Sequence, residues 1–173
     1  MNLTKQFIFA AVVVCIIAIP SSLDATSTRT ERQTLEGLKR VLVDVQVLRQ
    51  GEVSVELNQT AMRRDIQTTL DTLGIRRQGL PEAEKNGNIL GLTIAVMNPE
   101  SEGGMSGFYV YTAELVLRQR VKLVRKRGVR ASAITWMAST TGCAIPDELN
   151  NSVRRSVATV LEMFAEDYRE VNQ

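Results

Sequence analysis

The residues best suited to chemistry in this sequence are basic side chains gathered in one short stretch. Seven lysines and arginines lie between positions 118 and 130, with no aspartate or glutamate among them: Arg118, Arg120, Lys122, Arg125, Lys126, Arg127 and Arg130. Such side chains bind phosphate and carboxylate groups through charge-assisted hydrogen bonds. They also occur on the solvated face of a strand, where their aliphatic stems cover the sheet and their charges reach water. The sequence leaves both interpretations open: a site for an anionic partner, or a solvent-facing surface.

The catalytic mechanisms open to this chain are limited by the residues that its sequence lacks. It contains no histidine, which excludes Ser-His-Asp and Cys-His catalysis and zinc sites built on histidine. Two cysteines are too few for a cysteine-rich metal site. The glycine-rich stretch at 102–107 lacks the ending of a phosphate-binding loop, and there is no GxGxxG motif. We therefore expect no catalytic residues, no cofactor and no metal.

Carboxylates provide the one remaining route to an enzyme. Two of them can hydrolyse a glycosidic bond when they lie about 5 to 10 Å apart. The acidic residues of this chain are scattered on expected helices and loops, or stand singly within expected strands, as Asp44 and Glu114 do. A small carboxylate-dependent hydrolase acting on envelope glycans is therefore the alternative function.

The N-terminus has the three-part layout of a secretory signal peptide. Lys5 precedes an uncharged apolar run from Phe7 to Ile19, followed by Pro20 and small residues up to Ala25. The run is shorter than the roughly 20 residues of a membrane-spanning helix, so cleavage is favoured over a retained anchor. We expect residues 1–25 to be removed, which leaves a periplasmic or secreted protein without a transmembrane span.

Charge and cysteine content constrain the mature chain further. The formal net charge of +2 does not suggest a nucleic-acid partner, because the basic residues are clustered rather than abundant. Removal of the leader takes Cys15 with it, so Cys143 remains as a single cysteine that cannot form an internal disulfide. We expect Cys143 to be a buried small hydrophobic residue, with an intermolecular bridge as the alternative.

The elements that position the basic stretch follow from the hydrophobic periodicity. Apolar residues alternate at period two in four segments, which predicts strands at 40–48, 89–97, 108–125 and 131–139. A helix is predicted from Asn58 or Thr60 to Gly74, with Met62, Ile66 and Leu70 on its apolar stripe. The polar segments at 76–88 and 98–107 are predicted loops.

A second helix is predicted at the C-terminus. Its apolar stripe has helical spacing over about six turns and consists of Leu149, Val153, Val157, Val160, Phe164 and Tyr168. Trp136 is expected between the sheet and this helix, near Phe164 or Val160. The aromatic residues are thus interpreted as core.

Two helices and four strands with one apolar face each predict an α+β fold. We expect a two-layer sandwich with a four-stranded, mostly antiparallel sheet and both helices on one face, in the order β-α-β-β-β-α. The first strand should pair in parallel with a neighbour, because a strand-helix-strand unit prefers that crossover. Residues 26–38 are assigned to a flexible N-terminal segment and residues 39–173 to a single domain.

The hairpin register follows from a loop at Lys126 to Val129. It sets Arg125 opposite Arg130, and Gln119 beside Trp136. Three basic side chains then share the outer face and have no carboxylate across the strand pair: Arg118, Arg120 and Lys122.

Several stretches resemble a widespread, functionally uncharacterised family of small exported bacterial proteins. They are GLKRVLVDVQVL, IQTTLDTLGI, YVYTAELVLRQRVKL, ITWMASTTG and VLEMFAEDYREVN. The element order is more distantly similar to envelope assembly lipoproteins, namely the lipopolysaccharide-transport lipoprotein and the lipoprotein activators of peptidoglycan synthases. This chain departs from those proteins in lacking a lipidation signal. The resemblance implies a fold and no activity.

These observations together predict a non-enzymatic binding module of the cell envelope. Its partner is expected to be an envelope protein, an anionic envelope polymer or a lipid head group. The basic sheet face and hairpin, with the seven cationic residues named above, are the expected binding surface.

Overall fold

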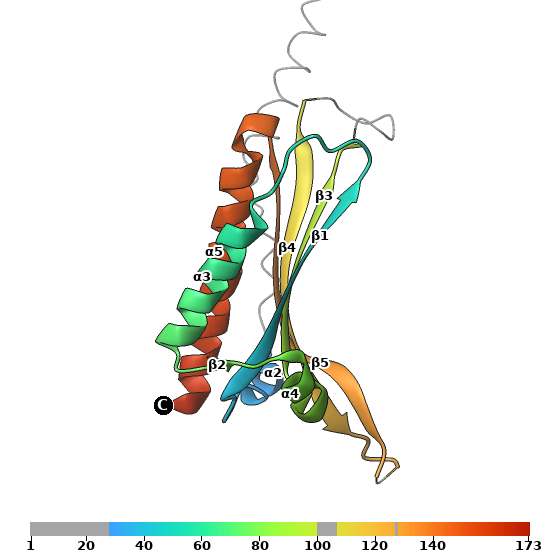
Figure 1. The fold of residues 1–173 in the computed structure, drawn as a ribbon, viewed down its shortest axis with the longest axis vertical. Helices are drawn as coiled ribbons and strands as arrows, with labels where there is room; N and C mark the ends of the chain where they lie inside the picture. The colour runs from blue at the N-terminus through green and yellow to red at the C-terminus, as the bar shows by residue number, and fades with distance from the viewer. Residues whose placement is uncertain (1–27, 100–106, 127) are drawn as a thin grey trace, which may run out of the picture.

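A computed structural model describes residues 28–99, 107–126 and 128–173, with the backbone alone for residues 84–86 (Figure 1). The expected signal peptide lies outside the described residues. So do Arg127 and all of the glycine-rich stretch except Gly107.

The described chain forms one sheet with two helices packed side by side on one of its faces (Figure 1). The strands are β1 (Arg40–Gln50), β2 (Arg76–Arg77), β3 (Ile89–Met97), β4 (Tyr109–Lys122) and β5 (Arg130–Ala144). The helices are α2 (Arg29–Gln33), α3 (Gln59–Thr72), α4 (Leu80–Asn86), the 3-10 turn η2 (Pro146–Glu148) and α5 (Leu149–Asn172). The strand order is β2-β1-β3-β4-β5.

The pairing directions confirm the expected α+β class. Strand β1 runs parallel to β2 and β3, whereas β3, β4 and β5 form antiparallel pairs in that order. The parallel pair β1–β3 is connected through α3, as a strand-helix-strand unit requires. The sheet has five strands rather than the expected four, because the two residues of β2 add a short strand outside β1.

The segment at 76–88, predicted to be a loop, contains β2 and α4. Helix α4 has Pro81 in its first turn and ends at Gly87, whose φ of 74° is in the left-handed region. A helix of 7 residues is too short to show an apolar period, so composition alone was misleading here.

The core lies between the sheet and helices α3 and α5. Met62, Ile66 and Leu70 of α3 are buried, and so is the predicted stripe of α5 except Tyr168, which is partly buried. Trp136 is fully buried, as predicted, and its ring meets the ring of Phe164 in an edge-to-face arrangement with centroids 5.2 Å apart. Such a pair adds to the stability gained from burial alone.

The N-terminal segment differs from its expected flexibility. Thr28 caps α2, and Leu35 and Leu38 are buried in the core. The hydroxyl of Tyr168 in α5 donates to the carbonyl of Leu38 at 3.1 Å. Residues 28–38 of this segment are held by contacts with the C-terminal helix, which periodicity within the segment could not reveal.

The hairpin register also differs from the prediction. Leu117 pairs with Trp136 and Lys122 with Arg130, so Gln119 does not face Trp136. Between these pairs the register shifts, and Thr135 is an extra residue in β5. Its hydroxyl donates to the side-chain oxygen of Gln119 at 2.7 Å. A bulge of this kind barely disturbs the alternation of apolar and polar residues along the opposite strand, so the sequence pattern did not indicate it.

Candidate anion-binding site

The basic stretch forms a two-stranded ribbon that projects from the sheet. The ladder between β3 and β4 ends at the pair Ile89 and Arg118, so residues 119–122 of β4 have β5 as their ladder partner. The ribbon extends beyond the sheet and the two long helices at the end of the molecule where α2, α4 and β2 also lie (Figure 1). We call residues 118–130 the basic hairpin.

Four cations lie on one face of this ribbon. Arg118, Arg120 and Lys122 alternate along β4, and Arg130 of β5 stands directly opposite Lys122. The remaining described pair, Arg125 and Lys126, is at the tip, and all six side chains are exposed. The structure therefore brings the six described members of the predicted set onto one projection, although their strand partners differ from those expected.

Carboxylates of the described chain form ion pairs elsewhere. Asp167 and Glu170 contact Arg32, and Asp65 contacts Arg154. Within the described residues no carboxylate lies within ion-pair distance of five hairpin cations: Arg118, Lys122, Arg125, Lys126 and Arg130. The hairpin thus presents concentrated positive charge to its surroundings.

The base of the hairpin is fixed by a close backbone approach. A Cβ atom on Gly87, at the end of α4, would lie 2.7 Å from the Cβ of Arg120 and 3.0 Å from its backbone nitrogen. Only glycine fits this contact and the left-handed φ together. Helix α4 can therefore end directly against β4 and support the hairpin where it leaves the sheet.

Further cations at this end of the molecule were missed by the sequence analysis. Strand β2 sets Arg76 beside Arg40, with Lys39 and Arg77 next to them, and all four residues are exposed. The side-chain amide of Asn88 donates to the carbonyl of Arg40 at 3.3 Å, and the preceding Gly87 itself meets Arg120. Two adjacent pairs of basic residues in the sequence were the only available signal, because β2 was not predicted.

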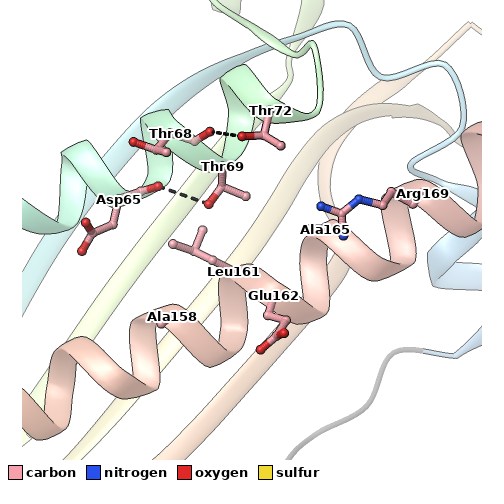
Figure 2. Close-up of a pocket in the computed structure, with 9 residues that line it drawn as sticks. All are labelled: Asp65, Thr68, Thr69, Thr72, Ala158, Leu161, Glu162, Ala165 and Arg169. Atoms are coloured by element: carbon pink, nitrogen blue, oxygen red, sulfur yellow. Dashed lines mark hydrogen bonds between the residues drawn. The ribbon is translucent and has the colours of Figure 1, made fainter.

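The carboxylate alternative has its candidates in the groove between α3 and α5. The groove has a volume of about 450 Å³. Figure 2 shows two of its lining carboxylates, Asp65 on α3 and Glu162 on α5. Both oxygens of Asp65 accept hydrogen bonds from Arg154 at 3.0 to 3.3 Å. The hydroxyls of Thr69 and Thr72 donate to carbonyls one turn earlier. Asp65, Thr69 and Thr72 thus have structural partners, and the hydrolase stays a prediction.

Two further features concern metals and membranes. In the described ranges there is no group of three or more cysteine or acidic side chains close enough to hold a metal ion. None of the helices in that part of the chain is long and apolar enough to span a bilayer.

Cys143 was predicted to be buried and is exposed. It lies in β5 opposite Val110, and the neighbouring Trp136, Ala138 and Thr140 fill the core side of the strand. Alternation from Trp136 places Cys143 on the outer face, so the prediction was wrong for a reason already present in the sequence.

No protein-family model and no curated protein matches the chain. Among solved structures, the chain is similar to two PelC dodecamers from Paraburkholderia phytofirmans, one of them a leucine-to-methionine variant. The identities are 18% for the variant and 15% for the other structure, and the TM-score is 0.41 in both cases. Each comparison covers 84% of this chain and 97% or 96% of the PelC chain.

Proposed function

We propose that this protein is an exported, non-enzymatic module of the cell envelope that binds an anionic partner through its basic hairpin. The observation that carries the proposal is the concentration of exposed cations on a projecting ribbon. The partner carries closely spaced negative charges, as a phosphorylated lipid head group, an acidic polymer or an acidic protein surface does. The secretory layout of the N-terminus supports the envelope setting.

Electrostatics favours an external source of negative charge. Lys122 and Arg130 are direct cross-strand neighbours, and like charges in this position are destabilising. Two unit charges at 4 Å repel by about 1 kcal/mol even in water. An anion lying across the ribbon removes this repulsion and gains charge-assisted hydrogen bonds.

A purely structural role is the competing explanation. The hairpin contains the start of the edge strand β5, and cations near an edge hinder pairing with other chains. That role requires no affinity for anions. Binding measurements therefore separate the two explanations.

The test uses vesicles and a soluble polymer as probes. Sedimentation with phosphatidylglycerol-containing vesicles, with phosphatidylcholine vesicles and with alginate compares lipid phosphates, neutral head groups and polymer carboxylates. We expect the protein to bind one or both anionic probes and not the neutral vesicles, with an affinity that falls as salt is added.

The variant Arg118→Glu with Arg120→Glu and Lys126→Glu should abolish this binding. Arg49→Glu with Arg155→Glu and Arg169→Glu is the matched control, because it makes the same change of net charge at exposed positions outside the hairpin. Equal losses in both variants would show that net charge, rather than the hairpin, is responsible. Absence of binding by the wild-type protein would leave the basic hairpin as a solvated surface.

A further inference from the structure

A second group of arginines surrounds a hollow at the opposite edge of the sheet. The hollow has a volume of about 380 Å³ and lies between α3 and the strands β1 and β2. Arg63, Arg64 and Arg77 line it together with Thr60 and Gln67, and no carboxylate is among its lining residues. The basic hairpin contributes no residue to it.

The three arginines reach the hollow from two elements. Asn58 caps α3 by accepting a hydrogen bond from the backbone of Ala61, so Arg63 and Arg64 lie close to the start of this helix. Arg77 is the register partner of Val41, whose side chain is buried on the helix-covered face. Register partners share a face, and Arg77 therefore faces α3.

One guanidinium is held in place by the sheet edge. The Nη2 atom of Arg63 donates to the carbonyl oxygen of Val45 in β1 at 3.2 Å. This bond uses one of the five N–H donors of the side chain, so the remaining donors can serve a ligand. It also gives Arg63 a structural role, which makes Arg64 and Arg77 the better positions to substitute.

The surrounding sequence does not neutralise this charge. The positions three and four residues from Arg63 and Arg64 in α3 hold no aspartate or glutamate. The acidic residue next to them, Asp65, makes its ion pair with Arg154 of α5 at 3.0 Å. Among the described residues, no carboxylate forms an ion pair with these three arginines.

The dimensions and lining indicate the class of ligand. Small-molecule sites occupy about 300 to 1,000 Å³, and this hollow lies near the lower limit. Each planar guanidinium group can bind two oxygens of a phosphate or a carboxylate through parallel hydrogen bonds. The apolar side chain of Val43, which shares the helix-covered face with Val41, offers a contact for the carbon skeleton of a sugar, and Thr60 and Gln67 offer hydrogen bonds for its hydroxyls.

We propose that this hollow is a binding site for a small anionic saccharide, either a sugar phosphate or a uronic acid. The shared chemistry is an oxyanion held by Arg64 and Arg77 and attached to a polyhydroxylated ring. The site is independent of the basic hairpin, so its presence or absence does not depend on the function proposed above.

The experiment titrates the purified protein with four compounds, monitored by calorimetry and by amide resonances. Glucose 6-phosphate and glucuronate test the two sources of oxyanion, inorganic phosphate tests the anion alone, and glucose tests the sugar alone. We expect glucose 6-phosphate or glucuronate to bind, to bind more tightly than phosphate or glucose, and to shift the amides of Thr60 and Gln67.

Substitutions then locate the site. Arg64→Gln with Arg77→Gln should weaken binding by about tenfold or more, as expected for the loss of charge-assisted hydrogen bonds. The lysine variant, Arg64→Lys with Arg77→Lys, keeps the charge and should show a smaller loss. Arg125→Gln with Lys126→Gln in the hairpin is the matched control and should bind as the wild-type protein does.

Three results would overturn the proposal. The first is no binding of either anionic sugar. The second is an unchanged affinity for the anionic sugar in both double variants of Arg64 and Arg77, the glutamine variant and the lysine variant. The third is a loss of binding in the hairpin control, which would move the oxyanion site to the basic hairpin.

Discussion

Arginine has two different surroundings in this molecule. Arg32 of α2 lies against α5, where its Nη1 contacts Glu170 at 2.6 Å and its Nε is 4.0 Å from Asp167. Asp167 also accepts a hydrogen bond from the indole nitrogen of Trp136 at 2.8 Å. The described arginines of the basic hairpin are instead exposed on a ribbon that leaves the sheet. One arginine joins the two termini of the domain, while the others add charge to a surface.

This contrast indicates that different residues determine the stability of the fold and the binding of anions. Substitutions around Trp136 and Arg32 should destabilise the fold in proportion to burial. Substitutions in the hairpin should change affinity for anions and leave the free energy of unfolding nearly unchanged. The largest effect on stability is therefore expected in the core, and the smallest in the hairpin.

Trp136→Ala should lower the free energy of unfolding by about 3 to 5 kcal/mol, because it leaves a cavity beside Phe164. Chemical denaturation measures the change. Ile134→Ala is the matched control on the same strand, since Ile134 is 52% exposed and its truncation should cost far less. Similar losses in the two variants would contradict the assignment of Trp136 to the core.

Asp167→Ala should lower the free energy of unfolding by about 1 to 3 kcal/mol, because the buried indole N–H of Trp136 loses its acceptor. Arg32 loses a neighbouring carboxylate in the same variant. Glu166→Ala, one residue earlier and exposed, should change stability little and serves as the control. Thermal unfolding of both variants measures the difference. Equal melting temperatures would contradict a stabilising role for the hydrogen bond between Trp136 and Asp167.

Arg154→Ala should cost only about 0.2 to 1 kcal/mol, the range of exposed ion pairs, since Arg154 and Asp65 are 52% and 33% exposed. A double-mutant cycle with Asp65→Ala measures their coupling. The coupling should shrink at high salt. A salt-independent coupling of several kcal/mol would show that the pair is a structural element comparable with Arg32 and Asp167.

Lys122→Gln should change stability by less than about 0.5 kcal/mol, as exposed substitutions do. The sign should be a slight increase, because Lys122 faces Arg130 across the ribbon. Arg130→Gln should behave in the same way, and the two effects should not add, since either change removes the same repulsion. A clear destabilisation by either substitution would assign the hairpin cations a structural role.

Elements whose apolar residues recur with a regular period were predictable from the sequence. Strand β3 was predicted at 89–97 and occupies those residues, because its apolar and small residues alternate without interruption. Helix α3 was predicted with Asn58 or Thr60 as its cap and Gly74 as its end, and the structure has Asn58 as the cap and Thr72 as the last helical residue. Both elements carry their own boundary signals, so no distant contact is needed to define them.

Elements that depend on distant partners were not predictable. Leu35 becomes buried only because α5 returns to the N-terminal end of the domain, where Asn172 donates to its carbonyl at 3.1 Å. The extra residue Thr135 in β5 is fixed by hydrogen bonds to Gln119 and Thr34 rather than by a local signal. Strand β2 has only two residues and exists through its pairing with β1.

The candidate site shows the same division. The cations of the hairpin could be identified from the sequence because they are close together on one ribbon. The arginine hollow could not, because Arg77 meets Arg63 and Arg64 only when β2 lies beside β1. Charge within one element is readable from sequence, whereas charge gathered from separate elements requires the fold.

The most direct test of the central claim is to ask which part of the molecule touches an anionic surface. Val124, at the tip of the basic hairpin, is 97% exposed and can be replaced by cysteine for labelling with an environment-sensitive dye. The exposed Cys143, near the far end of β5, provides the control label. The tip-labelled protein carries Val124→Cys together with Cys143→Ser, and the control protein keeps both native residues. Cys15→Ser is present in both proteins, so that each carries one dye.

On mixing with phosphatidylglycerol vesicles, the dye at position 124 should change its emission, and the dye on Cys143 should not. Added salt should reverse the change at the hairpin tip. A change at Cys143 with none at position 124 would contradict the account, because the protein would then meet the anionic surface with the end of the sheet opposite its basic hairpin.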